Sequence, residues 1–180
     1  MNDVLMKHVL LGISSNDQAR TRLLDAVQQL SGLSDICCLS SCYLNNAAYL
    51  STSASPSASS NLKPDKSPQY INAVLLISTS LNLLALTTSL KQIEASAEGV
   101  RANGICPLDL DIVAFEGETS EVLKSKDAYL WACIQEICPQ LQSELPIPEV
   151  WQQQVWPEFV VWQVPSQAVS DSVARLFGIA

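Results

Sequence analysis

A run of almost uninterrupted apolar residues, YINAVLLIST at 70–79, constrains the fold more than any other segment. A short run of this kind, bounded by polar residues, is typical of a strand in the middle of a sheet. The apolar character continues to Leu90, but Asn72, Ser78 and Asn82 interrupt it. We therefore expect a buried strand followed by a helix, rather than a segment that crosses a membrane.

The residues before this strand predict a strand, a helix and another strand. MKHVLLGI at 6–13 reads as the first strand, and SSND at 14–17 offers side chains that cap helices. Apolar residues recur at helical spacing from Asp17 to about Leu30, and Ser31-Gly32 is a typical helix end. DICCLSSCYL at 35–44 is expected to form the second strand.

The residues after it predict a helix capped by Asn82 that extends to about Ala97. LDLDIVAF at 108–115 reads as a strand, and YLWACIQEICPQL at 129–141 reads as a third helix. In the tail we expect a strand from Phe159 to Val164 and a short helix. The order β-α-β-β-α-β predicts an α+β fold with a ferredoxin-like split βαβ core, in which helices pack on an antiparallel sheet.

Length and charge narrow the possible classes of protein. A chain of 180 residues suits a single domain over 1–180, and the Ser/Pro-rich segment 51–69 is expected to be a mobile loop within it. A net charge of -8 argues against nucleic acid or an anionic membrane as a partner. The N-terminus does not have the pattern of a signal peptide, so we expect a cytoplasmic protein.

The six cysteines are expected to be free thiols, because a reducing compartment disfavours disulfides. They form no C-x-x-C pair, and His8 is the only histidine, so the sequence offers no zinc-site spacing. Buried and inert thiols are therefore the simplest interpretation. Cys106 stands apart because it lies just ahead of a pair of acids.

That pair, Asp109 and Asp111, lies in a segment that otherwise reads as a buried strand. Side chains alternate along a strand, so both acids should project from one face while Leu108 and Leu110 project from the other. Two carboxylates side by side repel each other. Either water screens them at the end of a strand, or a cation lies between them.

Several short motifs occur in a fixed order: ISSN at 13–16, SSCY at 40–43, PQYINAVLLISTSL at 68–81, KQIE at 91–94, PLDLDIVAF at 107–115 and LWACIQEICPQL at 130–141. Together they resemble the hydroxymethyldihydropterin pyrophosphokinase family. Enzymes of this family transfer a pyrophosphoryl group from ATP to the hydroxyl of a dihydropterin in the folate pathway. The resemblance extends over most of residues 6–142.

The resemblance implies roles for individual residues. Asp109 and Asp111 would be the catalytic acids that hold two Mg²⁺ ions on the ATP phosphates, a setting that suits a hard cation. Tyr70 and Asn72 would bind the pterin, whose flat ring needs a stacking partner and hydrogen bonds. From the residues alone, the preferred interpretation is that Tyr70 packs in the core and Asn72 caps a turn.

The chain also departs from the family pattern. A Thr-Pro-Pro unit that cradles the pterin is replaced by Asn45-Asn46-Ala47, and Ser14 replaces a glycine. The arginine-rich loop before the acid strand keeps Arg101 but has Cys106 where an arginine is expected. A His-Tyr pair and an arginine beyond that strand correspond to Ser120, Glu121 and Lys126, with Lys124 nearby. The second pterin-stacking aromatic falls at Ala128, with Tyr129 as the candidate substitute.

The resemblance thus implies an Mg²⁺-dependent pterin pyrophosphokinase with ATP and a dihydropterin as substrates. Lost arginines would weaken it, because a thiol supplies no charge and lysine lacks the bidentate fork of arginine. The alternative is a non-catalytic paralogue that keeps the fold as a nucleotide-binding, pterin-binding or regulatory protein. A third possibility is an unrelated ferredoxin-like interaction domain. Convergence of Arg101, Lys124 and Lys126 on the acid pair would favour catalysis.

Overall fold

The computed structural model describes residues 5–46, 69–97, 105–118, 128–141, 152–163 and 166–179. The described strands are β1 (Lys7–Ser15), β2 (Asp35–Leu39), β3 (Cys42–Asn46), β4 (Gln69–Thr79), β5 (Asp109–Phe115) and β6 (Gln152–Gln154). The helices are α1 (Ala19–Ser31), α2 (Leu83–Ser96), α3 (Ala128–Ile137), α4 (Gln167–Leu176) and a 3-10 turn, Val160–Trp162.

The strands form one antiparallel sheet with β4 at its centre. The order is β5-β1-β4-β3-β6, and β2 also pairs with β4. Along one side, β4 pairs with β1 from Lys7↔Thr79 to Ser15↔Ile71. Along the other side, it pairs with β2 at one end and with β3 at the other. The predicted α+β fold with a split βαβ core is therefore confirmed.

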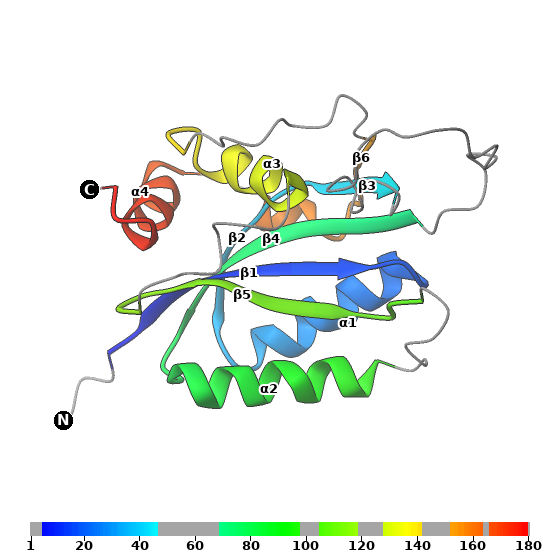
Figure 1. Ribbon diagram of the computed structural model, residues 1–180, viewed down its shortest axis with the longest axis horizontal. Coiled ribbons are helices and arrows are strands. Elements are labelled where there is room, and N and C mark those ends of the chain that lie inside the picture. Colours follow the sequence, from blue (N-terminus) through cyan, green and yellow to red (C-terminus); the bar gives the residue numbers. More distant parts are fainter. Residues whose placement is uncertain are drawn as a thin grey trace, which may run out of the picture.

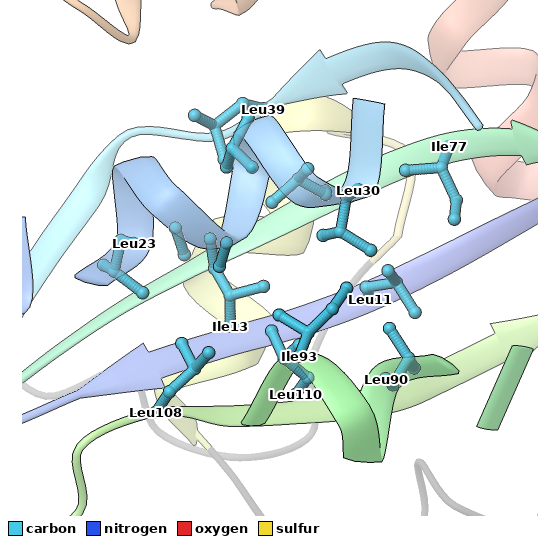
Figure 2. Close-up of a cluster of buried hydrophobic side chains, with 14 of the residues drawn as sticks. Leu11, Ile13, Leu23, Leu30, Leu39, Ile77, Leu90, Ile93, Leu108 and Leu110 are labelled. Atoms are coloured by element: carbon cyan, nitrogen blue, oxygen red, sulfur yellow. The ribbon is translucent and has the colours of Figure 1, made fainter. Parts of the chain in front are cut away.

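Helices cover both faces of the sheet. In Figure 1, α1 and α2 lie on one face, whereas α3 and α4 lie on the other. Leu75 and Ile77 of β4 pack into the α1/α2 core, while Val74 and Leu76 pack into the α3/α4 core. Figure 2 shows the first of these cores, where Ile93 of α2 meets strand residues such as Leu110. The near-continuous apolar run of β4 follows from this two-sided burial.

The start of α2 was predicted correctly and the start of α1 was not. Oδ1 of Asn82 accepts the N–H of Ala85 at 2.9 Å, as expected for a helix cap. In contrast, α1 begins after Gln18, which has left-handed backbone angles (φ 48, ψ 39) and makes no capping hydrogen bond with its side chain. The Asp17 carboxylate instead forms an ion pair at 3.0 Å with Arg22, a residue in the first turn of α1.

The expected strand over 35–44 is divided in two at Ser40 and Ser41. The N–H of Ser40 donates to the carbonyl oxygen of Val74 at 2.9 Å, and Oγ of Ser40 accepts the N–H of Val74 at the same distance. The pairing of β2 with β4 follows a different register from that of β3 with β4. A serine hydroxyl thus replaces a backbone acceptor where the strand shifts register.

The tail differs most from the prediction. The expected strand from Phe159 to Val164 is wrong, because Val160–Trp162 forms a 3-10 turn and β6 lies earlier in the chain. Phe159 is buried, with its ring centroid 5.3 Å from that of Trp156 and 6.3 Å from that of Trp162. These aromatics recur every third residue, which is a helical rather than a strand spacing. The short C-terminal helix was predicted correctly, as α4.

The third helix was expected to extend to Leu141 but ends at Ile137, just ahead of Pro139. The loop expected over 51–69 falls outside the described residues except for Gln69, which begins β4.

No helix in the described part of the chain is long and apolar enough to cross a membrane. As predicted, none of the six cysteines, all of which lie in the described residues, forms a disulfide. Burial, with Glu136 nearby, raises the pKa of Cys42 to about 12.

Candidate functional site

The two acids of β5 project from the same face of the sheet. Asp109 pairs with Ser14 and Asp111 with Gly12 on the neighbouring strand β1. Leu110, between them, points the opposite way and is buried in the α1/α2 core. Directly opposed residues of paired strands share a face, so the acids, Ser14 and Gly12 lie on the face that carries α3.

The acids interact with each other and with the end of α2. Burial raises the pKa of Asp111, and the charge of Asp109 and a hydrogen bond with it raise this pKa further. The charge of Lys91 opposes the shift, whereas Glu94 adds to it. The two carboxylates therefore lie close enough to compete for one proton or to share one cation.

The three described residues assigned to the pterin lie on this same face. Asn72 of β4 pairs with Ser14 of β1 on one side and with Tyr43 of β3 on the other. Two residues away, Tyr70 pairs with Asn45. The Nδ2 of Asn72 donates to Oδ1 of Asn45 at 2.7 Å. Asn72 is thus a mid-strand residue rather than a turn cap, and Tyr70 is partly exposed rather than part of the core.

Strand register therefore brings five predicted residues together. Ser14 lies opposite Asp109 on one side and opposite Asn72 on the other, so it links the acid pair to the asparagine pair across β1. The hydrogen bond between the two asparagines does not use the side-chain carbonyl oxygen of Asn72, an acceptor, or the amino group of Asn45, a donor. One sheet face thus combines carboxylates, amides and a phenol ring.

Helix α3 begins over this surface. A Cβ added at Gly12 would lie 3.2 Å from both Cδ atoms of Leu130 and 3.5 Å from Cγ2 of Val113. Leu130 is in the first turn of α3, so a side chain at Gly12 would require the end of the Leu130 side chain to shift by a few tenths of an ångström. Gly12 therefore lies at the border between the start of α3 and the polar surface that contains Ser14, Asp109 and Asn72.

The remaining predicted residues are not placed by the structure. Arg101, Lys124 and Lys126 lie outside the described residues, so their convergence on the acid pair stays a prediction. Tyr129 belongs to α3, but its side chain also lies outside the description. Among the described residues, Asp109 and Asp111 join no third His, Cys, Asp or Glu in a cluster that could hold a metal ion.

A comparison with protein families tests whether the chain belongs to the family that its motifs resemble. The family model described as 7,8-dihydro-6-hydroxymethylpterin-pyrophosphokinase (HPPK) matches residues 9–163. The chain belongs to this family. An unrelated ferredoxin-like interaction domain is thereby excluded, and the resemblance seen in the sequence is confirmed. A search of curated proteins gives no match.

Solved structures with this likeness include bifunctional HPPK-DHPS proteins of Plasmodium falciparum. A variant with STZ-DHP is 14% identical with a TM-score of 0.45, covering 63% of this chain and 31% of that chain. The wild type with pteroate is 15% identical with a TM-score of 0.43, covering 62% of this chain and 29% of that chain. The HPPK-family chain described here thus spans about a third of the length of these proteins.

Two residues that fit the HPPK motif after the first strand hold the acid strand in place. Oγ of Ser15 donates to the carbonyl oxygen of Pro107 at 2.6 Å. Asn16 and Cys106 exchange two hydrogen bonds: the Cys106 N–H donates to Oδ1 of Asn16 at 2.6 Å, and the Asn16 N–H donates to the Cys106 oxygen at 3.0 Å. The motif therefore anchors the turn that leads into Asp109.

We predict that Asn16→Ala lowers the free energy of unfolding by about 1–3 kcal/mol, because it leaves the N–H of Cys106 without its side-chain acceptor. Asn16→Asp is the matched control, because it keeps an oxygen at the same position. Urea denaturation of the two variants and the wild type checks this. Equal losses for alanine and aspartate would show that the hydrogen bond is not the cause.

A second cluster that the sequence analysis missed joins α3 to the break between β2 and β3. The carboxylate of Glu136 accepts the N–H of Ser41 at 3.1 Å, its hydroxyl at 2.6 Å and the hydroxyl of Tyr43 at 3.0 Å. Gln153 of β6 donates to Oγ of Ser41 at 2.6 Å. This network positions α3 relative to β3, which carries Asn45.

This cluster has a pH signature. Burial and the adjacent Glu136 carboxylate raise the pKa of Tyr43 from 10.0 to about 12. The folded protein therefore holds this proton more tightly than the unfolded chain, so the stabilisation is present below pH 10 and is lost as the pH rises toward 12. We expect Glu136→Gln to shift the late tyrosinate absorbance step to lower pH. Tyr43→Phe should remove that step, and a step unchanged in Tyr43→Phe would mean another tyrosine causes it.

A cavity of about 320 Å³ lies between α1 and α2, lined by residues such as Arg22, Gln29, Ser96 and Leu108. It is on the face of the sheet opposite to Asp109 and Asp111, because Leu108 and Leu110 face the α1/α2 core. The described residues that the resemblance assigns to metal and pterin therefore lie on the α3 side of the sheet rather than in this cavity.

Lys91 and Glu94 of α2 are the neighbours of the acid pair that the sequence analysis did not assign. Lys91 Nζ lies 2.8 Å from Oε2 of Glu94. Their i,i+3 spacing on a helix was visible in KQIE and is typical of an ion pair on one helix face. The hydrogen bond of Glu94 with Leu110 of β5 depends on the tertiary packing of α2, which no local pattern reveals.

Proposed function

We propose that this chain is an Mg²⁺-dependent pterin pyrophosphokinase, which transfers a pyrophosphoryl group from ATP to the hydroxymethyl group of a dihydropterin. The observation that carries the proposal is the strand register that joins two groups of residues on one face. Asp109 and Asp111 provide the acids, while Tyr70, Asn72 and Asn45 provide an aromatic ring and amides. Membership of the HPPK family supports the same reaction class.

The carboxylate pair fits Mg²⁺ that is shared with a substrate. Mg²⁺ prefers oxygen ligands and is commonly held by one or two carboxylates together with substrate phosphates, rather than by a cage of protein ligands. Asp109 and Asp111 supply two carboxylates, and the pKa of Asp111 is raised first by burial and then by the charge of Asp109, a repulsion that a cation would relieve. When bound, Mg²⁺ ions would neutralise phosphate charge, and two ions are expected by analogy with the family.

The other residues of this face would bind and orient the acceptor. The ring of Tyr70 would stack on the flat pterin. Asn72 and Asn45 would form hydrogen bonds with its edge through the amide groups that their mutual bond leaves available. Because both asparagines are held by each other and by paired strands, they would orient the pterin with little loss of side-chain freedom on binding.

We propose further that turnover is weak, because the cationic part of the site is incomplete. Cys106 stands where the family pattern has an arginine, and Lys91 is a described cation that acts on Asp111. The second candidate is a non-catalytic paralogue that binds nucleotide or pterin, and the thiol at position 106 favours it. Arg101, Lys124 and Lys126 would supply the remaining positive charge.

Isothermal titration calorimetry tests both candidates. The protein is titrated with a non-hydrolysable ATP analogue in the presence and absence of Mg²⁺ and of a hydroxymethylpterin. A pyrophosphokinase should bind the analogue only with Mg²⁺, and the pterin should alter the nucleotide affinity. Binding of both ligands without turnover of ATP would support the non-catalytic paralogue. Failure to bind either ligand would contradict both candidates.

A further inference from the structure

The segment that carries the acids lies at the edge of the sheet. β5 is the first strand in the order and pairs only with β1 among the described strands. In an antiparallel edge strand, every second residue directs its N–H away from its neighbour. Leu110 is such a residue, and its N–H donates to Oε1 of Glu94 on α2 at 2.8 Å. A helix side chain thus provides the acceptor that a further strand would otherwise supply.

The Glu94 side chain is itself held in place. It is 11% exposed, although it carries a carboxylate. Lys91 Nζ donates to Oε1 at 2.9 Å and to Oε2 at 2.8 Å, and Lys91 itself is 58% exposed. The carboxylate therefore has an inner contact with the strand and an outer contact with a lysine. A hydrogen bond to a charged acceptor is shorter and stronger than one between neutral groups.

The anchored amide lies between the two acids in the chain. Asp109 and Asp111 pair with β1, while Leu110 is held from the other side by Glu94. We propose that Glu94 is a positioning residue: it fixes the Leu110 amide and thereby sets the geometry of Asp109 and Asp111 toward a divalent cation. The inference rests on the metal-binding role proposed above. Partners that orient metal ligands typically change metal affinity by about 10–100-fold when they are removed.

Three variants separate the hydrogen bond from other effects of mutation. Glu94→Gln keeps an oxygen that can accept the Leu110 N–H but removes the charge. Glu94→Leu has a similar size and removes the acceptor. Gln92→Leu introduces the same apolar side chain at an exposed position of the same helix, so it controls for changes in α2 itself. Circular dichroism shows whether each variant retains its fold.

The first measurement needs no metal. Amide hydrogen exchange at Leu110, followed by NMR, should be at least roughly tenfold faster in Glu94→Leu than in the wild type. Glu94→Gln and Gln92→Leu should keep the protection of this amide. Equal exchange at Leu110 in Glu94→Leu and the wild type would overturn the proposal, because it would show that Glu94 does not anchor the strand.

The second measurement uses Mn²⁺ as the probe, with a non-hydrolysable ATP analogue, and follows free Mn²⁺ by electron paramagnetic resonance. Glu94→Leu should bind Mn²⁺ about 10-fold or more weakly, while Glu94→Gln stays within about 3-fold of the wild type. If both weaken binding equally, the charge rather than the anchored amide matters and the proposal is wrong. If the wild type binds no more Mn²⁺ than Asp109→Asn, the proposed function is contradicted, and so is the claim that Glu94 sets cation binding by the acid pair. Exchange at Leu110 would still decide the anchoring.

Discussion

Replacement of Asp109 or Asp111 with asparagine should lower the affinity for an Mg²⁺–nucleotide complex by at least about tenfold, because each change removes a carboxylate from a pair that fits this cation. They lie on one face, and the pKa of Asp111 is raised by burial and then by the charge of Asp109, so the two acids are candidates to share metal ions. Calorimetry with a non-hydrolysable ATP analogue and Mg²⁺ measures the loss. Asp25→Asn, at an exposed position of α1, is the matched control.

Asp111→Asn, which should weaken binding of the Mg²⁺–nucleotide complex, should stabilise the metal-free protein at neutral pH. The pKa of Asp111 is raised in the folded state above 3.8, so ionisation of this group is less favourable in the folded protein than in the unfolded chain. Its contribution to stability is therefore present at low pH and is lost as the pH rises through the folded pKa. Asp111→Asn should gain relative to the wild type at pH 7 but not at pH 3.

We expect this gain to be below about 1 kcal/mol, because Asp111 is only partly buried and water still screens the repulsion. Urea denaturation at the two pH values, without divalent cations, measures it. A destabilised Asp111→Asn at neutral pH would show that Asp111 serves the fold rather than a ligand. A site retained at some cost to stability is a common mark of function.

The fold could be predicted from local patterns where burial or a helix cap leaves a clear mark in the sequence. β4 shows a run of apolar residues because both of its faces are covered, and Asn82 marks the start of α2 through an ordinary cap. The tail could not be predicted in this way. Trp156 and Phe159 precede the 3-10 turn and Trp162 ends it, and three aromatic residues at this spacing are too short a signal to separate from a strand.

The site was only partly visible in the sequence. The period-two spacing of Asp109 and Asp111 is sufficient to place both on one face. In contrast, Ser15 and Asn16 were read as part of a motif, and their role as an anchor for the turn at 106–107 depends on contacts about 90 residues apart. Glu94 lies 16 residues from Leu110, and Glu136 lies 95 residues from Ser41. Such contacts follow from packing and are absent from any local pattern.

The departures from the family pattern lead to a prediction about charge. ATP carries about four negative charges, and the transition state of phosphoryl transfer spreads charge over the transferred oxygens. A protein of net charge -8 must offset this with few cations and Mg²⁺. Cys106, which stands where an arginine is expected, is partly exposed, and both of its hydrogen bonds to Asn16 involve its backbone rather than its thiol. Replacement of the side chain at this position therefore leaves both backbone hydrogen bonds with Asn16 in place.

We expect Cys106→Arg to tighten binding of the Mg²⁺–ATP analogue by roughly tenfold or more, because a charged hydrogen bond contributes about 1.5–3 kcal/mol. Position 106 is three residues before Asp109, a distance of at most about 10 Å along the chain, so a guanidinium there can reach phosphates held by the acid pair. Cys37→Arg is the control, because it makes the same change in net charge at a partly exposed thiol on β2.

Steady-state turnover with ATP and a dihydropterin completes the test. The wild type should be slower than the ~1–100 s⁻¹ that is common for kinases, and Cys106→Arg should raise its rate. Cys37→Arg lies far from the acid pair, so its small effect acts only through long-range charge and should be screened at high ionic strength. The gain in rate from Cys106→Arg comes from direct contact with phosphate, so a larger fraction of it should remain. A wild type that already turns over in this range would show that other residues have replaced the missing arginine, and the reading of this chain as a weakened family member would then be wrong.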